Sequence, residues 1–69
     1  MREQGTVARL VTDRGFGFIR PAEGEGDLFF HRSAVEADRF EDLRIGEAVT
    51  YEVGNWLKGR RAEDVRRSA

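Results

Sequence analysis

The chain has 69 residues, of which 39% are hydrophobic and 36% are charged, which predicts one small domain with a small core. It contains no cysteine, which excludes disulfides and cysteine metal sites, and no apolar run long enough for a signal peptide or a membrane span. Its 12 basic and 13 acidic residues give a net charge of −1, so the whole molecule has no strong field to attract a polyanion. We expect a single domain over residues 1–69, with a core at about 5–65 and a frayed tail at 66–69.

The first two predicted strands lie at residues 5–12 and 15–20, joined by a turn at 13–14. Over residues 14–20, the two-residue period of a strand puts four large side chains on one face: Arg14, Phe16, Phe18 and Arg20. The other face carries Gly15, Gly17 and Ile19. Because an unpaired buried arginine is costly, we expect the arginine face to meet solvent and both phenylalanine rings to be exposed. The glycine spacing is expected to open room around each ring.

The third predicted strand, at residues 28–31, repeats this arrangement. Leu28 and Phe30 share one face, and Asp27, Phe29 and His31 share the face expected to meet water. The short, acidic loop at 21–26 makes the second and third strands antiparallel neighbours. Four rings then form one platform, here called the ring cluster: Phe16, Phe18, Phe29 and His31. Flat rings flanked by arginines suit unpaired nucleobases and phosphates. The alternative is that some of these rings are core residues beneath a long loop.

The connection after the third strand is charged and short of apolar periodicity. Residues 33–36 have the spacing of a capping box, which predicts one helical turn. Leu43 is expected in the core, whereas Phe40 is either a core residue or a binding ring.

The last part of the chain supplies two more strands. The fourth, at 48–53, alternates and has three side chains expected inside: Val49, Tyr51 and Val53. A loop at 54–59 leads to a short fifth strand near 61–65. Five short strands with glycine-rich turns and no amphipathic helix predict a small β-barrel, closed or nearly closed.

Two stretches resemble the ribonucleoprotein motifs of bacterial cold-shock domain proteins. Residues 14–19, Arg-Gly-Phe-Gly-Phe-Ile, are similar to the first motif, and residues 28–31, Leu-Phe-Phe-His, to the second. The resemblance covers residues 5 to about 65. RNA-recognition-motif domains share the first motif but need two packed helices, which this chain does not supply. The resemblance implies an all-β, five-stranded antiparallel barrel of the OB type that binds single-stranded RNA and DNA by stacking bases on surface rings.

The resemblance also implies a set of nucleic-acid contacts, position by position. The stacking rings are those of the ring cluster and Phe40. Arg14 stands where the family usually has lysine, Asp27 matches a polar position that contacts bases, and Lys58 matches a basic loop position. Four basic side chains are expected near phosphates: Arg14, Arg20, Lys58 and Arg60.

Two aromatic positions of the family are missing, which makes the chain a divergent member. Where typical members carry Trp-Phe-Asn in the first strand, this chain has Arg9, Leu10 and Val11, so the stacking tryptophan is gone. The phenylalanine that normally follows the second-motif histidine is Arg32. Arginine can itself stack on a base, so Arg9 and Arg32 either alter the site or weaken it.

Trp56 lies in a loop that is longer than in typical members. Three roles stay open for it: it replaces the missing tryptophan, it folds back with Leu57 as an apolar lid, or it contacts another chain.

The leading function is a non-catalytic binder of single-stranded RNA or DNA that acts as an RNA chaperone or as a regulator of transcription or translation. The alternative is a protein-interaction module on the same barrel, with weakened nucleic-acid binding. One histidine and no cysteine offer no nucleophile–base pair and no metal cluster, so we expect no catalytic residue, metal, cofactor or small-molecule substrate. We also expect a cytoplasmic monomer without a membrane partner. The choice between RNA and DNA stays open.

Overall fold

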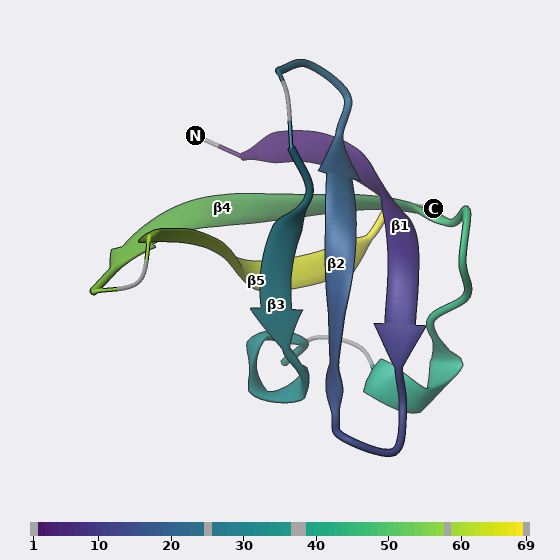
Figure 1. Ribbon diagram of the computed structural model, residues 1–69. Helices are drawn as coiled ribbons and strands as arrows, with labels where there is room; N and C mark the ends of the chain where they lie inside the picture. The colour runs from purple at the N-terminus through teal and green to yellow at the C-terminus, as the bar shows by residue number, and fades with distance from the viewer. Residues whose placement is uncertain (1, 25, 37–38, 58, 69) are drawn as a thin grey trace.

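The computed structural model describes residues 2–24, 26–36, 39–57 and 59–68 of the chain. It has five strands among these residues, β1 Glu3–Val11, β2 Phe16–Pro21, β3 Leu28–His31, β4 Ala48–Trp56 and β5 Gly59–Arg67 (Figure 1). The strands close into a barrel in the order β1-β2-β3-β5-β4. Neighbouring strands are antiparallel except β3 and β5, which run parallel where Phe29 pairs with Arg61. The predicted all-β barrel is confirmed, with this one parallel pair.

Alternate residues of the strands fill the barrel, as the two-residue period predicts. Val49 and Tyr51 of β4 each expose 1% of their surface, and Val53 packs against them partly buried. Among the described residues, the buried hydrophobic side chains are Val7, Ile19, Phe30, Ala34, Val35, Phe40, Leu43, Val49, Tyr51, Ala62 and Val65. The inward face predicted for β4 is therefore confirmed.

Gly17 of β2 faces the core and lies against the Phe30 ring. A Cβ atom at this position would lie 2.9 Å from Cε1 of Phe30 and 2.6 Å from the carbonyl oxygen of Arg9. The glycine therefore makes room for a core ring beneath the strand. Our expectation that this spacing opens room around the outer rings is wrong for Gly17.

The connection between β3 and β4 contains two 3₁₀ turns, η1 Arg32–Ala34 and η2 Phe40–Asp42. The N-cap of η1 is His31, whose ring nitrogen Nδ1 accepts a hydrogen bond from the Ser33 backbone N–H at 3.1 Å. A helical turn does form here, but it begins one residue before the predicted capping box. No helix among the described residues is long and apolar enough to cross a membrane.

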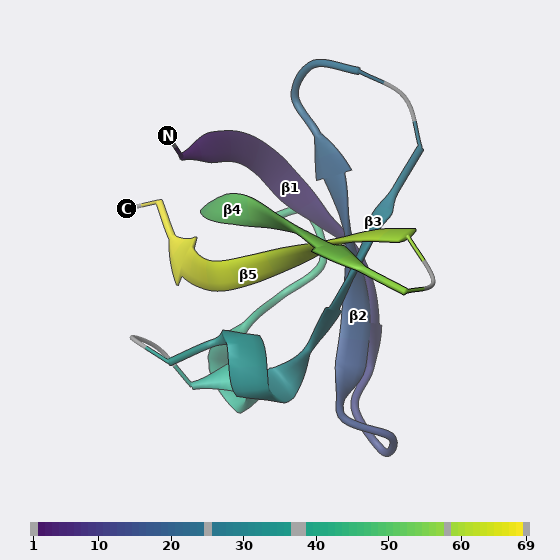
Figure 2. The same cartoon turned by 90° about the vertical axis from the view of Figure 1, so that its left-hand side faces the viewer.

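The β4–β5 hairpin is longer than predicted and projects from the barrel on the side of β3 (Figure 2). Trp56 pairs with Gly59, so most of the loop predicted at 54–59 is strand. At the other end, Arg66 and Arg67 pair with Thr50 and Val49, and the Ser68 N–H donates to the Ala48 carbonyl at 3.0 Å. The frayed tail predicted from residue 66 is thus wrong as far as Ser68, because these backbone groups complete the β4 ladder.

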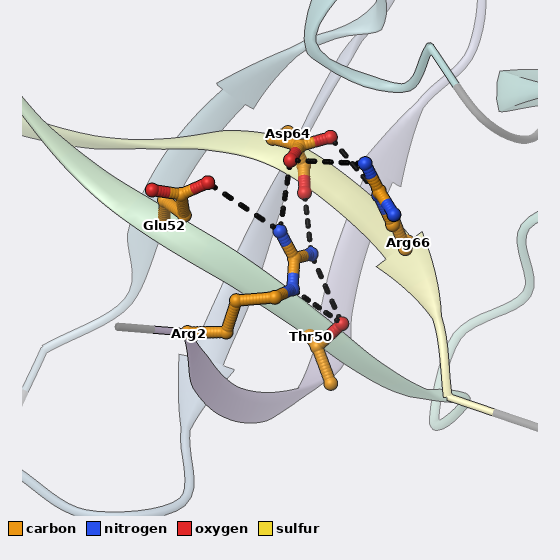
Figure 3. Close-up of polar contacts among 5 residues, drawn as sticks. All are labelled: Arg2, Thr50, Glu52, Asp64 and Arg66. Carbon is orange, nitrogen blue, oxygen red and sulfur yellow. Dashed lines mark hydrogen bonds and ion pairs between the residues drawn. The ribbon is translucent and has the colours of Figure 1, made fainter.

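Arg2 ties the start of β1 to β4 and β5 through a polar cluster (Figure 3). Its Nη1 lies 2.9 Å from Oδ2 of Asp64, and its Nε donates to Oγ1 of Thr50 at 3.1 Å. Arg66 donates from Nε to the other carboxylate oxygen of Asp64 at 3.1 Å. Asp64 has a φ of +48° and lies opposite the register shift between Thr50 and Glu52. The cluster therefore holds a β-bulge at the seam of three strands.

Candidate nucleic-acid interface

Three phenylalanine rings meet on the outer face of β2 and β3. Phe18 stands opposite Phe29 in the antiparallel register, and Phe16 stands opposite His31. The centroid of Phe16 lies 5.9 Å from that of Phe18 and 5.4 Å from that of Phe29, and the centroids of Phe18 and Phe29 are 6.0 Å apart. All three side chains are half-buried and lie outside the core cluster. The predicted ring cluster therefore exists as a geometric unit on the surface rather than in the core.

His31 completes the ring cluster at the end of β3. Its Nδ1 receives the Ser33 backbone N–H and also lies 2.9 Å from the Ser33 hydroxyl oxygen. Because Nδ1 accepts a hydrogen bond, the neutral imidazole carries its hydrogen on Nε2. Two contacts to Ser33 thus fix the orientation of a half-exposed ring whose Nε2–H remains available as a donor.

Phe40 does not join the ring cluster. Only 6% of its surface is exposed, and its ring packs edge-to-face on the core ring of Phe30 at 6.1 Å between centroids. The expectation that Phe40 stacks on a base is corrected: η2 turns the ring inward, where it covers the end of the barrel. Leu43, predicted in the core, is buried as expected.

Arginines border the ring cluster on two sides. Arg9 of β1 pairs with Phe18 and is exposed because β1 shifts register between Val7 and Arg9, which turns the side chain outward. Arg32 is exposed and its side chain lies over Gly15, where a Cβ atom would come within 2.9 Å of the Arg32 Cδ. Both positions expected to replace family rings therefore lie beside the ring cluster.

The other polar residues predicted for the site are placed unevenly. Arg14 is exposed in the β1–β2 turn, and Arg60 is exposed on β5. Asp27 is exposed, and one carboxylate oxygen lies 3.5 Å from Nε of Arg20, so these two residues form an ion pair. Lys58 lies outside the described residues.

Trp56 lies beside the ring cluster, on the side of β5. Together with Phe29 and Arg61 it lines a groove of about 510 Å³, to which Leu57, Gly59 and Arg60 also contribute. Trp56 exposes 51% of its surface and Leu57 is fully exposed, so the two do not form a lid. Because the strand order is β1-β2-β3-β5, Trp56 lies across the ring cluster from Arg9 and does not fill the place of the missing tryptophan.

Arg61 is a residue of this surface that the sequence did not single out. Its guanidinium carbon lies 3.5 Å above the Trp56 ring centroid, and it pairs in register with Phe29. The pairing of β4 with β5 as far as Trp56 and Gly59 could have pointed to it, but the sequence predicts a loop at residues 54–59 instead of paired strand. Among the described residues, no group of three or more His, Asp or Glu side chains could hold a metal ion.

Comparisons with known proteins agree on one family. The model of the family described as 'Cold-shock' DNA-binding domain matches residues 3–68. The chain is 41% identical over 61 residues to Cold shock protein CapA of Pseudomonas fragi, which covers 88% of this chain and 95% of that protein. It is 43% identical over 63 residues to Cold shock protein CspA of Staphylococcus aureus, covering 91% and 94%. A solved structure titled drosophila Unr CSD456 superposes with a TM-score of 0.82 at 33% identity over the whole of this chain, which spans 27% of that one.

Proposed function

The chain belongs to the cold-shock domain family, and from this premise we propose that it binds single-stranded RNA or DNA on the ring cluster. The observation that carries the proposal is the meeting of Phe16, Phe18 and Phe29 within 6.0 Å of one another on an outer sheet face. Exposed aromatic faces on a strand pair are a platform on which unpaired bases of any sequence stack.

Arginines supply the charge that such a platform needs. Arg9, Arg14 and Arg32 are exposed around the rings, and none of them has an acidic partner among the described residues. Their guanidinium groups are free to fork onto phosphates or to stack on bases. Arg9 and Arg32 thereby act in place of the two family rings that the chain lacks.

The proposed mechanism is passive and non-catalytic. Bases that leave a weak hairpin stack on the ring cluster, so binding favours the open strand over the paired one by mass action. This is the requirement for an RNA chaperone, and it equally serves a regulator that keeps a transcript open. The monomeric state and the cytoplasmic location expected from the sequence stay predictions.

The proposal predicts that Phe18→Ala and Phe29→Ala each weaken binding. Base–aromatic stacking contributes about 1–3 kcal/mol per base, so the dissociation constant should rise about 5- to 150-fold. Anisotropy of labelled oligothymidylate and oligouridylate measures this, and comparison of the two probes gives the preference between DNA and RNA. Ile45→Ala is the matched control, because Ile45 is an exposed apolar residue in the turn before β4, outside the ring cluster, with 67% exposure.

The alternative is a protein-interaction module. It is favoured by the two ring-to-arginine replacements, since aromatic and arginine side chains also dominate protein hot spots. The same titration decides between the two functions. If the folded wild type binds neither oligonucleotide, nucleic-acid binding is contradicted and this surface is better explained as a protein-binding site.

A further inference from the structure

We infer that the tip of the β4–β5 hairpin carries an additional base-stacking subsite, formed by Trp56 on Arg61, that extends the ring cluster beyond Phe29. The inference rests on the proposed function and deepens it, because it assigns the direction in which the bound strand continues. Its occupant is an unpaired nucleotide of the same strand that the ring cluster holds.

The first argument is that Trp56 is held in place although it is exposed. Its indole N–H donates to Oε2 of Glu63 at 3.0 Å, and the Arg61 guanidinium covers one ring face at 3.5 Å. Glu63 in turn lies 3.7 Å from Nε of Arg61 and packs against Gly54, where a Cβ atom would come within 2.5 Å of its carboxyl carbon. An exposed aromatic ring that is fixed before binding loses little side-chain entropy when a ligand stacks on it.

The second argument is continuity with the ring cluster. Phe29 belongs to both surfaces: its ring lies 5.4 Å from Phe16 on one side, and it lines the groove shared with Trp56 on the other. Arg61 stands between them, paired in register with Phe29 and stacked on Trp56. A nucleic-acid strand that leaves Phe29 toward β5 therefore meets another aromatic ring, and the carboxylate beside that ring, Glu63, is already paired with Arg61 and Trp56.

The third argument is the chemistry of the groove. Its walls are the apolar faces of Phe29, Trp56 and Leu57, and its cationic groups are Arg60 and Arg61. A flat apolar ring beside guanidinium groups matches a nucleotide, which offers a base to the ring and a phosphate to the cation. Arg60 is exposed and has no acidic partner among the described residues, so its guanidinium is available to a phosphate, whereas Arg61 is paired with Glu63 and supports the Trp56 ring.

The test is a length series of labelled oligothymidylates of about 4 to 16 nucleotides, the range of site sizes on OB folds. Trp56 is the only tryptophan of the chain, so its emission reports on this subsite alone. We expect quenching and tighter binding only with strands long enough to reach the hairpin. Trp56→Ala should weaken binding of those strands about 5- to 150-fold and leave short strands unaffected, whereas Trp56→Phe, which keeps a ring, should retain part of the gain.

Each other result overturns the inference in a distinguishable way. If Trp56→Ala binds long strands as wild type does, the subsite is absent, and weaker short-strand binding by Phe18→Ala then shows that the ring cluster still works alone. A wild type that binds no strand removes both the proposed function and this extension of it. A concentration-dependent dimer that Trp56→Ala abolishes, without any gain with strand length, assigns the hairpin to protein contact instead.

Discussion

Single residues divide this small barrel into two layers of rings. Phe30 and Phe40 pack inside, and Phe16, Phe18 and Phe29 lie on the outer face of β2 and β3. Phe29 and Phe30 are adjacent in the chain yet serve opposite layers because successive strand residues point to opposite faces. Gly17 allows the layers to lie this close, since it removes a side chain from the point where the Phe30 ring meets β2.

Gly17→Ala is therefore expected to destabilise the fold. The added methyl would meet the Arg9 carbonyl oxygen at 2.6 Å and the Phe30 ring at 2.9 Å, and neither can turn aside freely. Overpacking of this kind costs about 1–3 kcal/mol, to be measured from urea unfolding midpoints. Gly54→Ala is the comparison, because the three atoms nearest to its Cβ belong to the carboxyl group of Glu63, a flexible surface side chain whose displacement costs only its exposed contacts to Trp56 and Arg61 and no core packing. Equal stability of Gly17→Ala and wild type would contradict this packing.

At the scale of elements, the sequence predicts strands well where neighbouring residues alternate between apolar and polar. It predicts them poorly where the length of a strand depends on pairing with a distant segment. The face of each ring in β2 and β3 follows from the two-residue period, and β3 was predicted at its observed bounds, Leu28–His31. The burial of Phe40 and the length of the β4–β5 hairpin do not follow from local pattern. Phe40 is buried through its contact with Phe30, and the hairpin extends because distant backbone groups pair. The outward turn of Arg9 likewise depends on a bulge that the sequence does not mark.

The seam between β1, β4 and β5 is a second element-scale feature with a measurable consequence. Hydrogen bonding from Arg66, with the charges of Arg66 and Arg2, lowers the pKa of Asp64 below its ordinary value of 3.8, although burial acts in the opposite direction. A lowered folded-state pKa means that the carboxylate stabilises the fold above the unfolded-state value, and that this contribution is lost as pH falls through the folded-state value.

Asp64→Asn should therefore lower the urea midpoint at neutral pH, and the difference from wild type should shrink as pH falls below 3.8. Asparagine is the suitable replacement because it keeps an acceptor oxygen and tolerates the positive φ of +48° at this position. A midpoint difference that stays constant across this pH range would show that the charge of Asp64 contributes nothing to the seam.

The whole molecule combines a net charge of −1 with a locally basic binding face. Acidic residues neutralise several arginines elsewhere: Arg20 pairs with Asp27, and Arg66 pairs with Asp64. Four exposed arginines near the rings and the groove have no acidic partner among the described residues: Arg9, Arg14, Arg32 and Arg60. Because the molecule as a whole has a net charge of only −1, we expect base stacking and these few arginine contacts, rather than long-range attraction, to dominate affinity.

This distribution predicts a shallow salt dependence. Each phosphate contact with a single strand contributes a slope of about 0.7 in log affinity against log salt, so contacts from these four arginines give a slope magnitude of roughly 2 to 4. Anisotropy titrations of an oligothymidylate across a salt series measure the slope, and Arg14→Ala should reduce it by about 0.7 while Arg44→Ala, on an exposed turn before β4, leaves it unchanged. A much steeper slope would mean that further cations reach the strand. A slope near zero, with binding intact, would mean that the strand is held by its bases alone and that the arginines around the rings act by stacking.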